Sequence, residues 1–180
     1  MSNAEALSRT DVILEAALAV FSRYGFKRAS MADIAAAAQL SRPLLYLSFQ
    51  NKADVFVAAA RRFARMCSEA GEAAWPPGMA PRLGLPALAR AQHLPVWRLL
   101  QGSPHGAELV EAGGGMLDEL HTAAEARLTA FLASRLPAGH DPDLPGMISA
   151  ALHGIKGAAT SEAAFDAHVE ALARLLPTSG

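Results

Sequence analysis

The side chains best suited to chemistry lie close together in the sequence, between residues 30 and 52. This stretch, SMADIAAAAQLSRPLLYLSFQNK, carries hydroxyl, guanidinium and ammonium groups that donate hydrogen bonds to anions. Arg42 can donate to O6 and N7 of a guanine, and exposed leucines can cover thymine methyl groups. The hydroxyl and ammonium groups around them suit phosphate oxygens. We therefore predict contact with double-stranded DNA at Ser30, Ser41, Arg42, Pro43, Leu44, Tyr46, Leu47, Ser48 and Lys52.

Two short helices joined by a tight turn must position these side chains. The Ser-x-x-Asp pattern from Ser30 is close to a capping box and predicts a helix start. Ser41 is a second N-cap with Pro43 in the first turn of its helix, which we expect to end near Phe49. Leu45 and Phe49 are four residues apart and share the inward face of that helix. Such a pair is typical of a helix-turn-helix, whose second helix enters the DNA major groove.

Longer helices are predicted on both sides of this pair. The first runs from about Arg9 to Tyr24 and is ended by Gly25. The second runs from Lys52 to about Ala74 and, with some 20 residues, spans about 30 Å. It is long enough to join a small N-terminal DNA-binding domain (the head) to a separate, larger helical domain (the body). The apolar stripe of the first helix has a helical period and consists of Ile13, Ala17, Val20, Phe21 and Tyr24.

The remainder of the chain is also helical but is interrupted by prolines, ten of which follow Trp75. Three glycines at residues 113–115 should interrupt or bend one of its helices. The expected helices are residues 83–92, 96–102, one from about 105, 116–136, 143–159 and 161–176. The sequence therefore predicts an all-α protein of about nine helices. A three-helix helix-turn-helix head at residues 5–51 is joined by the long helix to a larger body at residues 52–180.

Residues 13–56 resemble the DNA-binding domain of the TetR (tetracycline-repressor) family of bacterial regulators. The family usually has Gly where Gln39 stands in the turn, and a non-Gly residue at positive φ costs about 1 kcal/mol. Ala32 stands where members can carry a longer base-reading side chain, so base reading is expected to fall on the helix after Ser41. The motifs that carry the resemblance are Ala17-x-x-x-Phe21, Tyr24-Gly25, SMADIA from Ser30, and LSRPLLYxxFxNKxxV from Leu40.

The resemblance implies a sequence-specific DNA-binding transcriptional regulator, by default a repressor that a small, largely apolar effector releases from a palindromic operator. It also implies a body that binds this effector and forms a homodimer through its last two helices. The expected pocket residues are Phe63, Met66, Cys67, Trp97, Leu100, Met116, Leu120 and His121. The expected interface residues are Met147, Ile148, Ala151, Leu152, Ile155, Phe165, Val169 and Leu172. Apolar residues at helical spacing also fit a plain core within one chain, and that alternative stays open for both sets.

Composition and charge agree with a folded, DNA-binding protein. At 52% hydrophobic and 18% charged, the chain is not a disordered one. Residues 1–65 hold nine Lys or Arg against five Asp or Glu, whereas residues 66–180 hold seven against twelve. A basic head on an acidic body is typical of a DNA reader. With no leader and no long uncharged run, we expect a cytoplasmic protein without membrane contact.

A few residues outside the predicted DNA-binding segment bear on other possible functions. A redox-sensing regulator built on Cys67, the single cysteine, is one alternative, although an apolar burial site would make the thiol inert. A small-molecule-binding helical protein with a degenerate DNA head is another. We expect no enzyme, cofactor or metal, because His105 with Glu108, and His140 with its neighbouring aspartate, complete no ligand set. A non-specific architectural DNA protein would carry much more positive charge.

Overall fold

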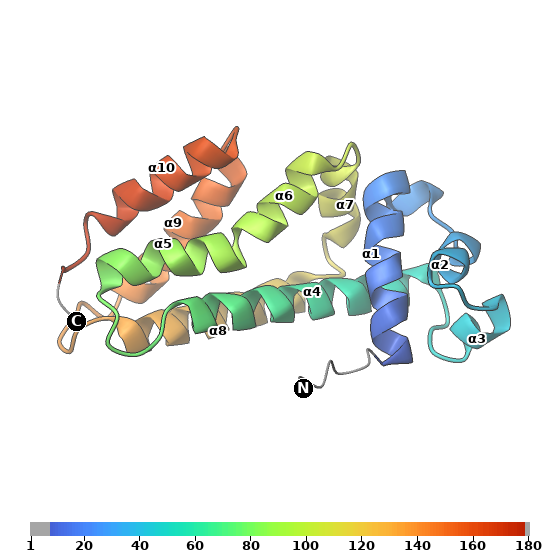
Figure 1. Ribbon diagram of the computed structural model, residues 1–180, viewed down its shortest axis with the longest axis horizontal. Coiled ribbons are helices and arrows are strands. Elements are labelled where there is room, and N and C mark those ends of the chain that lie inside the picture. The colour runs from blue at the N-terminus through green and yellow to red at the C-terminus, as the bar shows by residue number, and fades with distance from the viewer. Residues whose placement is uncertain (1–7, 179–180) are drawn as a thin grey trace, which may run out of the picture. The chain divides into compact units, whose positions relative to one another are not determined.

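The computed structural model describes residues 8–178, and this part of the chain is all-α, as the sequence predicts (Figure 1). No helix within it is both long enough and apolar enough to cross a membrane. The helices of the described residues are α1 (Arg9–Arg28), α2 (Met31–Ala37), α3 (Arg42–Tyr46), α4 (Lys52–Ala74), α5 (Pro81–Gln92), α6 (Leu94–Gly102), α7 (Gly106–Gly113), α8 (Asp118–Arg135), α9 (Leu144–Ala158) and α10 (Glu162–Ala173).

The chain forms two compact units, and each is built from two separate stretches of sequence. Unit 1 comprises the residues up to Phe63 together with Leu99–Asp118. Unit 2 comprises Ala64–Arg98 together with the residues from Glu119 onward. The chain passes from one unit to the other three times: inside α4, inside α6 and at the start of α8.

Unit 1 has a core of aliphatic and aromatic side chains from α1 to α4. Four of the five stripe residues predicted on α1 are buried, but Tyr24 is 40% exposed, contrary to the expectation. Gly25 breaks α1 where the sequence predicts its end, because its φ of 76° is not helical, and helical residues resume before Ala29. The ring of Phe56 meets Phe21 and Phe26 edge-on at centroid distances of 5.2 Å in both cases.

Within unit 1, α7 packs against α1 and holds its kinked end. The Glu108 carboxylate accepts a hydrogen bond from the backbone N–H of Lys27 at 2.6 Å. It also fills the space beside Gly25, where a Cβ atom would collide with it. The Ser103 hydroxyl donates to the carbonyl of Ser22 at 2.7 Å. Segments about 80 residues apart in sequence are therefore joined at the C-terminal end of α1.

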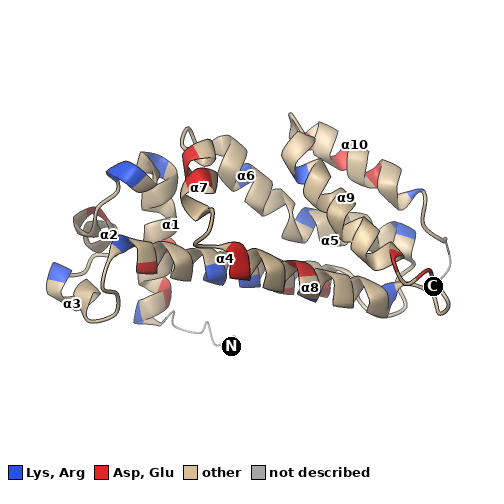
Figure 2. Cartoon of the chain, turned by 180° about the vertical axis from the view of Figure 1, so that it is seen from behind, with Lys and Arg blue, Asp and Glu red and all other residues tan. Residues whose placement is uncertain are grey.

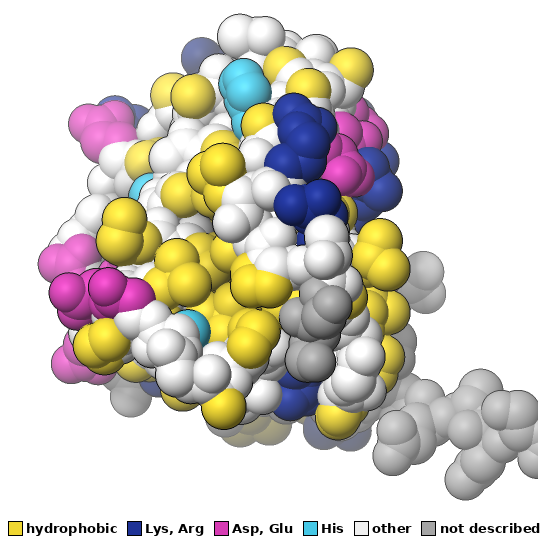
Figure 3. Space-filling view, turned by 90° about the vertical axis from the view of Figure 1, so that its left-hand side faces the viewer, with side chains coloured by type: hydrophobic (Ala, Val, Ile, Leu, Met, Phe, Trp, Pro, Cys, Tyr) yellow, Lys and Arg dark blue, Asp and Glu magenta, His cyan; other side chains and the backbone are white. Residues whose placement is uncertain are grey.

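The core of unit 2 is formed by side chains of α5, α6, α8, α9 and α10 together with Trp75, which directly follows α4. Its two tryptophans are buried, and each indole N–H has a partner. Trp75 donates to the carbonyl of Met79 at 3.1 Å, and Trp97 donates to the carbonyl of Ala159 at 3.0 Å. Figure 3 shows one side of unit 2, with hydrophobic side chains gathered over its middle and charged ones near its edges.

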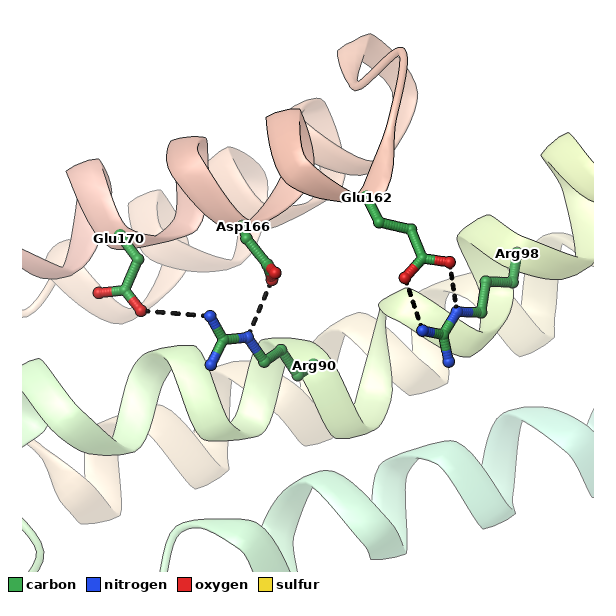
Figure 4. A network of polar contacts seen from close by, with 5 residues as sticks. All are labelled: Arg90, Arg98, Glu162, Asp166 and Glu170. Carbon is green, nitrogen blue, oxygen red and sulfur yellow. Dashed lines mark hydrogen bonds and ion pairs between the residues drawn. The ribbon is translucent and has the colours of Figure 1, made fainter.

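Ion pairs at the surface of unit 2 join α5 and α6 to α10 (Figure 4). Arg98 makes a two-pronged contact with Glu162 at 2.8 and 2.6 Å. Arg90 reaches Asp166 at 2.9 Å and Glu170 at 3.5 Å. All five side chains are more than a third exposed, so each pair contributes little to the stability and mainly fixes the register of α10.

The last two helices pack inward more than the sequence suggests. Four of the eight residues expected at a dimer interface lie in the core of unit 2, each at most 2% exposed, because α9 and α10 turn their apolar stripes toward α5 and α8. These four are Ile148, Leu152, Phe165 and Val169. Among the others, Met147 is 67% exposed, whereas Ala151, Ile155 and Leu172 are half-buried. Their role at an interface stays a prediction.

Candidate nucleic-acid interface

The start of α2 is fixed by a reciprocal cap. The Ser30 hydroxyl accepts from the backbone N–H of Asp33 at 3.2 Å and donates to the Asp33 carboxylate at 2.6 Å. The backbone N–H of Ser30 donates to the same carboxylate at 2.9 Å. These hydrogen bonds from Ser30 lower the pKa of Asp33 below its usual 3.8. The Ser30 hydroxyl is therefore committed to the cap of α2.

The turn between α2 and α3 contains a left-handed residue, Gln39, at the position where the TetR family usually has glycine. Gln39 has a φ of 56°, alone among the described non-glycine residues in having positive φ. The N–H of Leu40 donates to the carbonyl of Ala35 at 2.9 Å, and that of Gln39 donates to Ala36 at 3.1 Å. This is the hydrogen-bond pattern of a Schellman motif, here closed by glutamine instead of glycine.

The helix α3 ends earlier than predicted, at Tyr46 instead of near Phe49. The N–H groups of Ser48 and Phe49 both donate to the carbonyl of Leu45, at 3.0 and 3.1 Å, so the chain turns there. The turn is needed because α4 begins only a few residues later, where the Asn51 side chain accepts from the N–H of Asp54 at 3.0 Å.

The exposed side of α3 collects most of the residues predicted to contact DNA. Leu45 is fully buried and anchors the helix, whereas Tyr46 and Leu47 are 52% and 82% exposed. Leu44 is half-buried, and the Ser41 side chain makes no capping hydrogen bond. The remaining predicted residues of this segment are all exposed: Ser41, Arg42, Pro43 and Ser48. Polar donors and an aliphatic side chain are thus exposed together in α3 and at its two ends.

Lys52 has a different position from the one expected of a phosphate ligand. Its Nζ donates to three backbone carbonyls, those of Phe26 at 2.8 Å, Lys27 at 3.0 Å and Ala29 at 3.1 Å. It also lies 4.8 Å from the centroid of the Phe26 ring. A lysine ammonium has three protons to donate, so these carbonyls occupy all of them. The side chain satisfies the orphan carbonyls at the end of α1 and ties α4 to that end.

Charges on unit 1 are unevenly distributed (Figure 2). Arg42 on α3, and Lys27 and Arg28 at the end of α1, are exposed cations. The acidic side chains of α7 lie close to the end of α1, where Glu111 pairs with Lys27 at 3.7 Å. Further along, Arg62 of α4 meets Asp11 of α1 at 2.7 Å. Of these exposed cations, Arg42 is the one that belongs to the segment predicted to contact DNA.

The residues expected to line an effector pocket are divided between the units. Unit 1 holds Phe63, Leu100 and Met116, and unit 2 holds Met66, Cys67, Trp97, Leu120 and His121. The surface grooves of the two units involve other residues, except that Met116 borders a groove of about 510 Å³ beside the first turns of α4. An open groove of about 830 Å³ in unit 2 runs between α8 and α9. The pocket assignment stays a prediction.

Cys67 is buried and chemically quiet. It is 6% exposed, and burial raises the pKa of its thiol to about 11. The thiolate is the reactive form of cysteine, so at neutral pH this side chain is unreactive. Nothing in its surroundings therefore favours the redox-sensing alternative.

Comparisons with known proteins place this geometry among DNA-binding regulators. Residues 13–59 match a family described as bacterial regulatory proteins, tetR family. A transcriptional regulator from Rhodococcus sp. Rha1 is 17% identical, with a TM-score of 0.74 over 94% of this chain and 96% of its own. A TetR-like transcriptional regulator from Rhodococcus sp. RHA1 is 27% identical, with a TM-score of 0.59 over 94% and 97%. The fatty acid degradation regulator FadR from Bacillus halodurans is 19% identical, with a TM-score of 0.67 over 95% of each chain.

Proposed function

Because the chain belongs to the TetR family of bacterial regulatory proteins, we propose that this DNA-binding transcriptional regulator represses genes from a palindromic operator and leaves it when a small effector binds. The observation that supports the proposal best is the exposed surface of α3, where Tyr46 and Leu47 are 52% and 82% exposed. Leu47, the C-cap residue of α3, gains nothing for the fold by projecting into water. It gains apolar contact when α3 enters a major groove lined with thymine methyl groups.

The proposal gives a role to most of the exposed residues in α3 and at its two ends. Arg42 donates to a guanine edge and so selects one base pair. Leu47 covers a thymine methyl group, and the hydroxyls of Ser41, Tyr46 and Ser48 donate to phosphate oxygens. Residues that hold the turn and the cap act indirectly, because they set the angle at which α3 is presented.

A dimer would present two copies of α3 to the two halves of a palindrome, whose centres lie about 34–36 Å apart. The outward side of α9 offers a surface for such pairing. Met147 is 67% exposed, and a Cβ atom added at Gly146, Gly154 or Gly157 would meet nothing within 4 Å. Small residues on one helix face let a second helix approach closely. We propose that two copies of this face meet in the homodimer.

Release by an effector would operate through one conformational equilibrium. The helix α4 is continuous from Lys52 to Ala74 and contributes residues to both units. An effector that favours one shape of unit 2 would change the presentation of α3 through α4, so effector and operator would weaken each other's binding by the same factor. Since its target is chromosomal DNA, we infer that the protein acts in the cytoplasm.

Selection of bound duplexes from a random pool tests the function directly. Wild-type protein should enrich a palindromic site, with an affinity about a thousand times or more above that for random duplex at a stated salt concentration.

Arg42→Ala should relax the preference at one position of each half-site, at a cost of about 1–3 kcal/mol for the preferred base. Tyr46→Phe should weaken binding to all duplexes equally. An unchanged base preference in Arg42→Ala would show that α3 does not read the bases as proposed.

A further inference from the structure

The end of α1 carries a lysine whose backbone is held from two other helices of unit 1. The N–H of Lys27 donates to the Glu108 carboxylate of α7 at 2.6 Å. The carbonyl of Lys27 accepts from the ammonium of Lys52, at the start of α4, at 3.0 Å. Both backbone hydrogen-bonding groups of Lys27 are therefore bound by side chains, so the point from which its own side chain projects is fixed.

The ammonium of Lys27, by contrast, is loosely held. The side chain is 72% exposed, and its Nζ lies 3.7 Å from the carboxylate of Glu111, whose side chain is 74% exposed. A close hydrogen bond between an ammonium and a carboxylate measures about 2.7–2.9 Å, so this pair is a long one. An exposed pair stabilises a fold very little, and another anion can therefore replace Glu111.

Lys27 lies next to the element that faces the DNA backbone in a helix-turn-helix. The first helix of such a pair crosses the backbone while the second enters the groove, and these two helices are α2 and α3 here. Lys27 precedes Ser30, the N-cap of α2, by three residues. A duplex seated on α3 would therefore bring phosphate oxygens toward α2 and toward the lysine beside it.

The acidic side chains of α7 offset the positive charge at this place, and Figure 2 shows them beside the basic end of α1. Glu108 is fixed, because it accepts from the N–H of Lys27 and lies 3.3 Å from Nδ1 of His105. Glu111 is exposed at its pair with Lys27. It can therefore part from the ammonium while Glu108 keeps α7 attached to α1.

We propose that Lys27 is a phosphate ligand of the bound duplex and that Glu111 competes with the phosphate for it. In the free protein the ammonium pairs with Glu111, and on DNA it exchanges this carboxylate for a phosphate oxygen. The exchange is favourable because it releases counterions that are condensed on the duplex. Since a phosphate contact carries no base information, Glu111 lowers the affinity for all duplexes alike. The inference rests on the proposed function, because it adds a contact and a means of regulation at the same DNA-binding surface.

Salt titrations of the full-length protein test the phosphate contact. The probes are a labelled duplex that carries the selected site and a random-sequence duplex of the same length. Lys27→Met should reduce the slope of log affinity against log salt by about one for each bound subunit, on both duplexes. Lys27→Arg, which keeps the charge, should retain the wild-type slope. Both changes leave the backbone hydrogen bonds of residue 27 in place, so both variants should fold.

A double-mutant cycle tests the competition. Glu111→Gln removes the competing charge and should raise the affinity for both duplexes by up to about fivefold for each bound subunit, as expected for one exposed ion pair. The control is Glu15→Gln, which removes the same charge at an exposed position of α1. In the Lys27→Met background, Glu111→Gln should have no larger effect than this control.

The proposal is overturned if Lys27→Met keeps the wild-type slope, because no phosphate contact is then lost. It is equally overturned if Glu111→Gln strengthens binding by the same factor with and without Lys27, because the glutamate then acts only through the overall charge. An enriched site with an unchanged slope removes the Lys27 contact and leaves the proposed function. A reduced slope on random duplex without any enriched site would keep the contact and remove the proposed function.

Discussion

Two of the residues predicted to contact DNA instead hold the parts of unit 1 that present α3. Lys52 is the clearest example, because its three hydrogen bonds to carbonyls satisfy the end of α1. Ser30 is similar, since its hydroxyl and N–H are used in the cap of α2. Substitutions at such positions should lower DNA affinity by loosening the reading helix, not by removing a contact with DNA.

Lys52→Met separates these two roles. It leaves three carbonyls at the end of α1 without their donor, and we expect it to lower the free energy of unfolding by about 1–3 kcal/mol. The slope of log affinity against log salt should stay as in the wild type, because no phosphate contact is lost. Urea unfolding followed by circular dichroism and operator titrations at several salt concentrations measure both quantities. A slope reduced by about one would instead identify Lys52 as a phosphate ligand.

Gln39 carries a local strain that can be removed. Its φ of 56° disfavours every residue with a Cβ, and glycine adopts this conformation without cost. Gln39→Gly should therefore raise the free energy of unfolding by up to about 1 kcal/mol. The same measurement on Gln50→Gly, outside the helices and at negative φ, supplies the control and should show no gain. A destabilised Gln39→Gly variant would mean that the glutamine side chain contributes more than its backbone costs.

At the scale of elements, the stability that the contact between α7 and the end of α1 contributes should depend on pH. The pKa of Glu108 is lowered below its usual 4.5, first by the hydrogen bond from the N–H of Lys27 and then by the charges of His105 and Lys27. A lowered folded pKa means that the stabilisation is complete above pH 4.5. It is lost as the pH falls through the folded pKa.

Glu108→Gln tests this contact. At neutral pH the variant should unfold at a lower urea concentration than the wild type, and the difference should shrink as the pH falls below 4.5. Glu111→Gln, one turn along the same helix face at an exposed pair with Lys27, should show little difference at either pH. If the difference in urea midpoint between the wild type and Glu108→Gln did not change with pH, the stabilisation from Glu108 would come from packing and not from its charge.

The sequence predicted those elements whose ends carry local signals. The bounds of α4 agree with Lys52–Ala74, and Ser30, Gly25 and Pro43 mark ends that local capping and backbone rules determine. The positions of Lys52 and Glu108 depend on partners 23–26 and 81 residues away, respectively, which no local pattern reveals. The apolar stripes of α9 and α10 were visible, but their periodicity is the same whether a stripe faces its own core or a second subunit.

At the scale of the whole molecule, the proposed dimer is the feature most open to a direct test. Gly154→Arg adds a long charged side chain at a position where the chain itself leaves open space. We expect the variant to fold with unchanged helical content but to be monomeric by light scattering, and to bind a palindromic duplex much more weakly. Gly102→Arg, also in open space but on α6, should remain dimeric. A dimeric Gly154→Arg protein would move the subunit contact away from this face.

The division into units also separates the chain's natural chromophores. Both tryptophans, Trp75 and Trp97, belong to unit 2, whereas both tyrosines, Tyr24 and Tyr46, belong to unit 1. Tryptophan emission therefore reports on unit 2 alone, and tyrosine absorbance reports mainly on unit 1. Without any attached dye, a single unlabelled sample can reveal whether the two units melt together or one after the other.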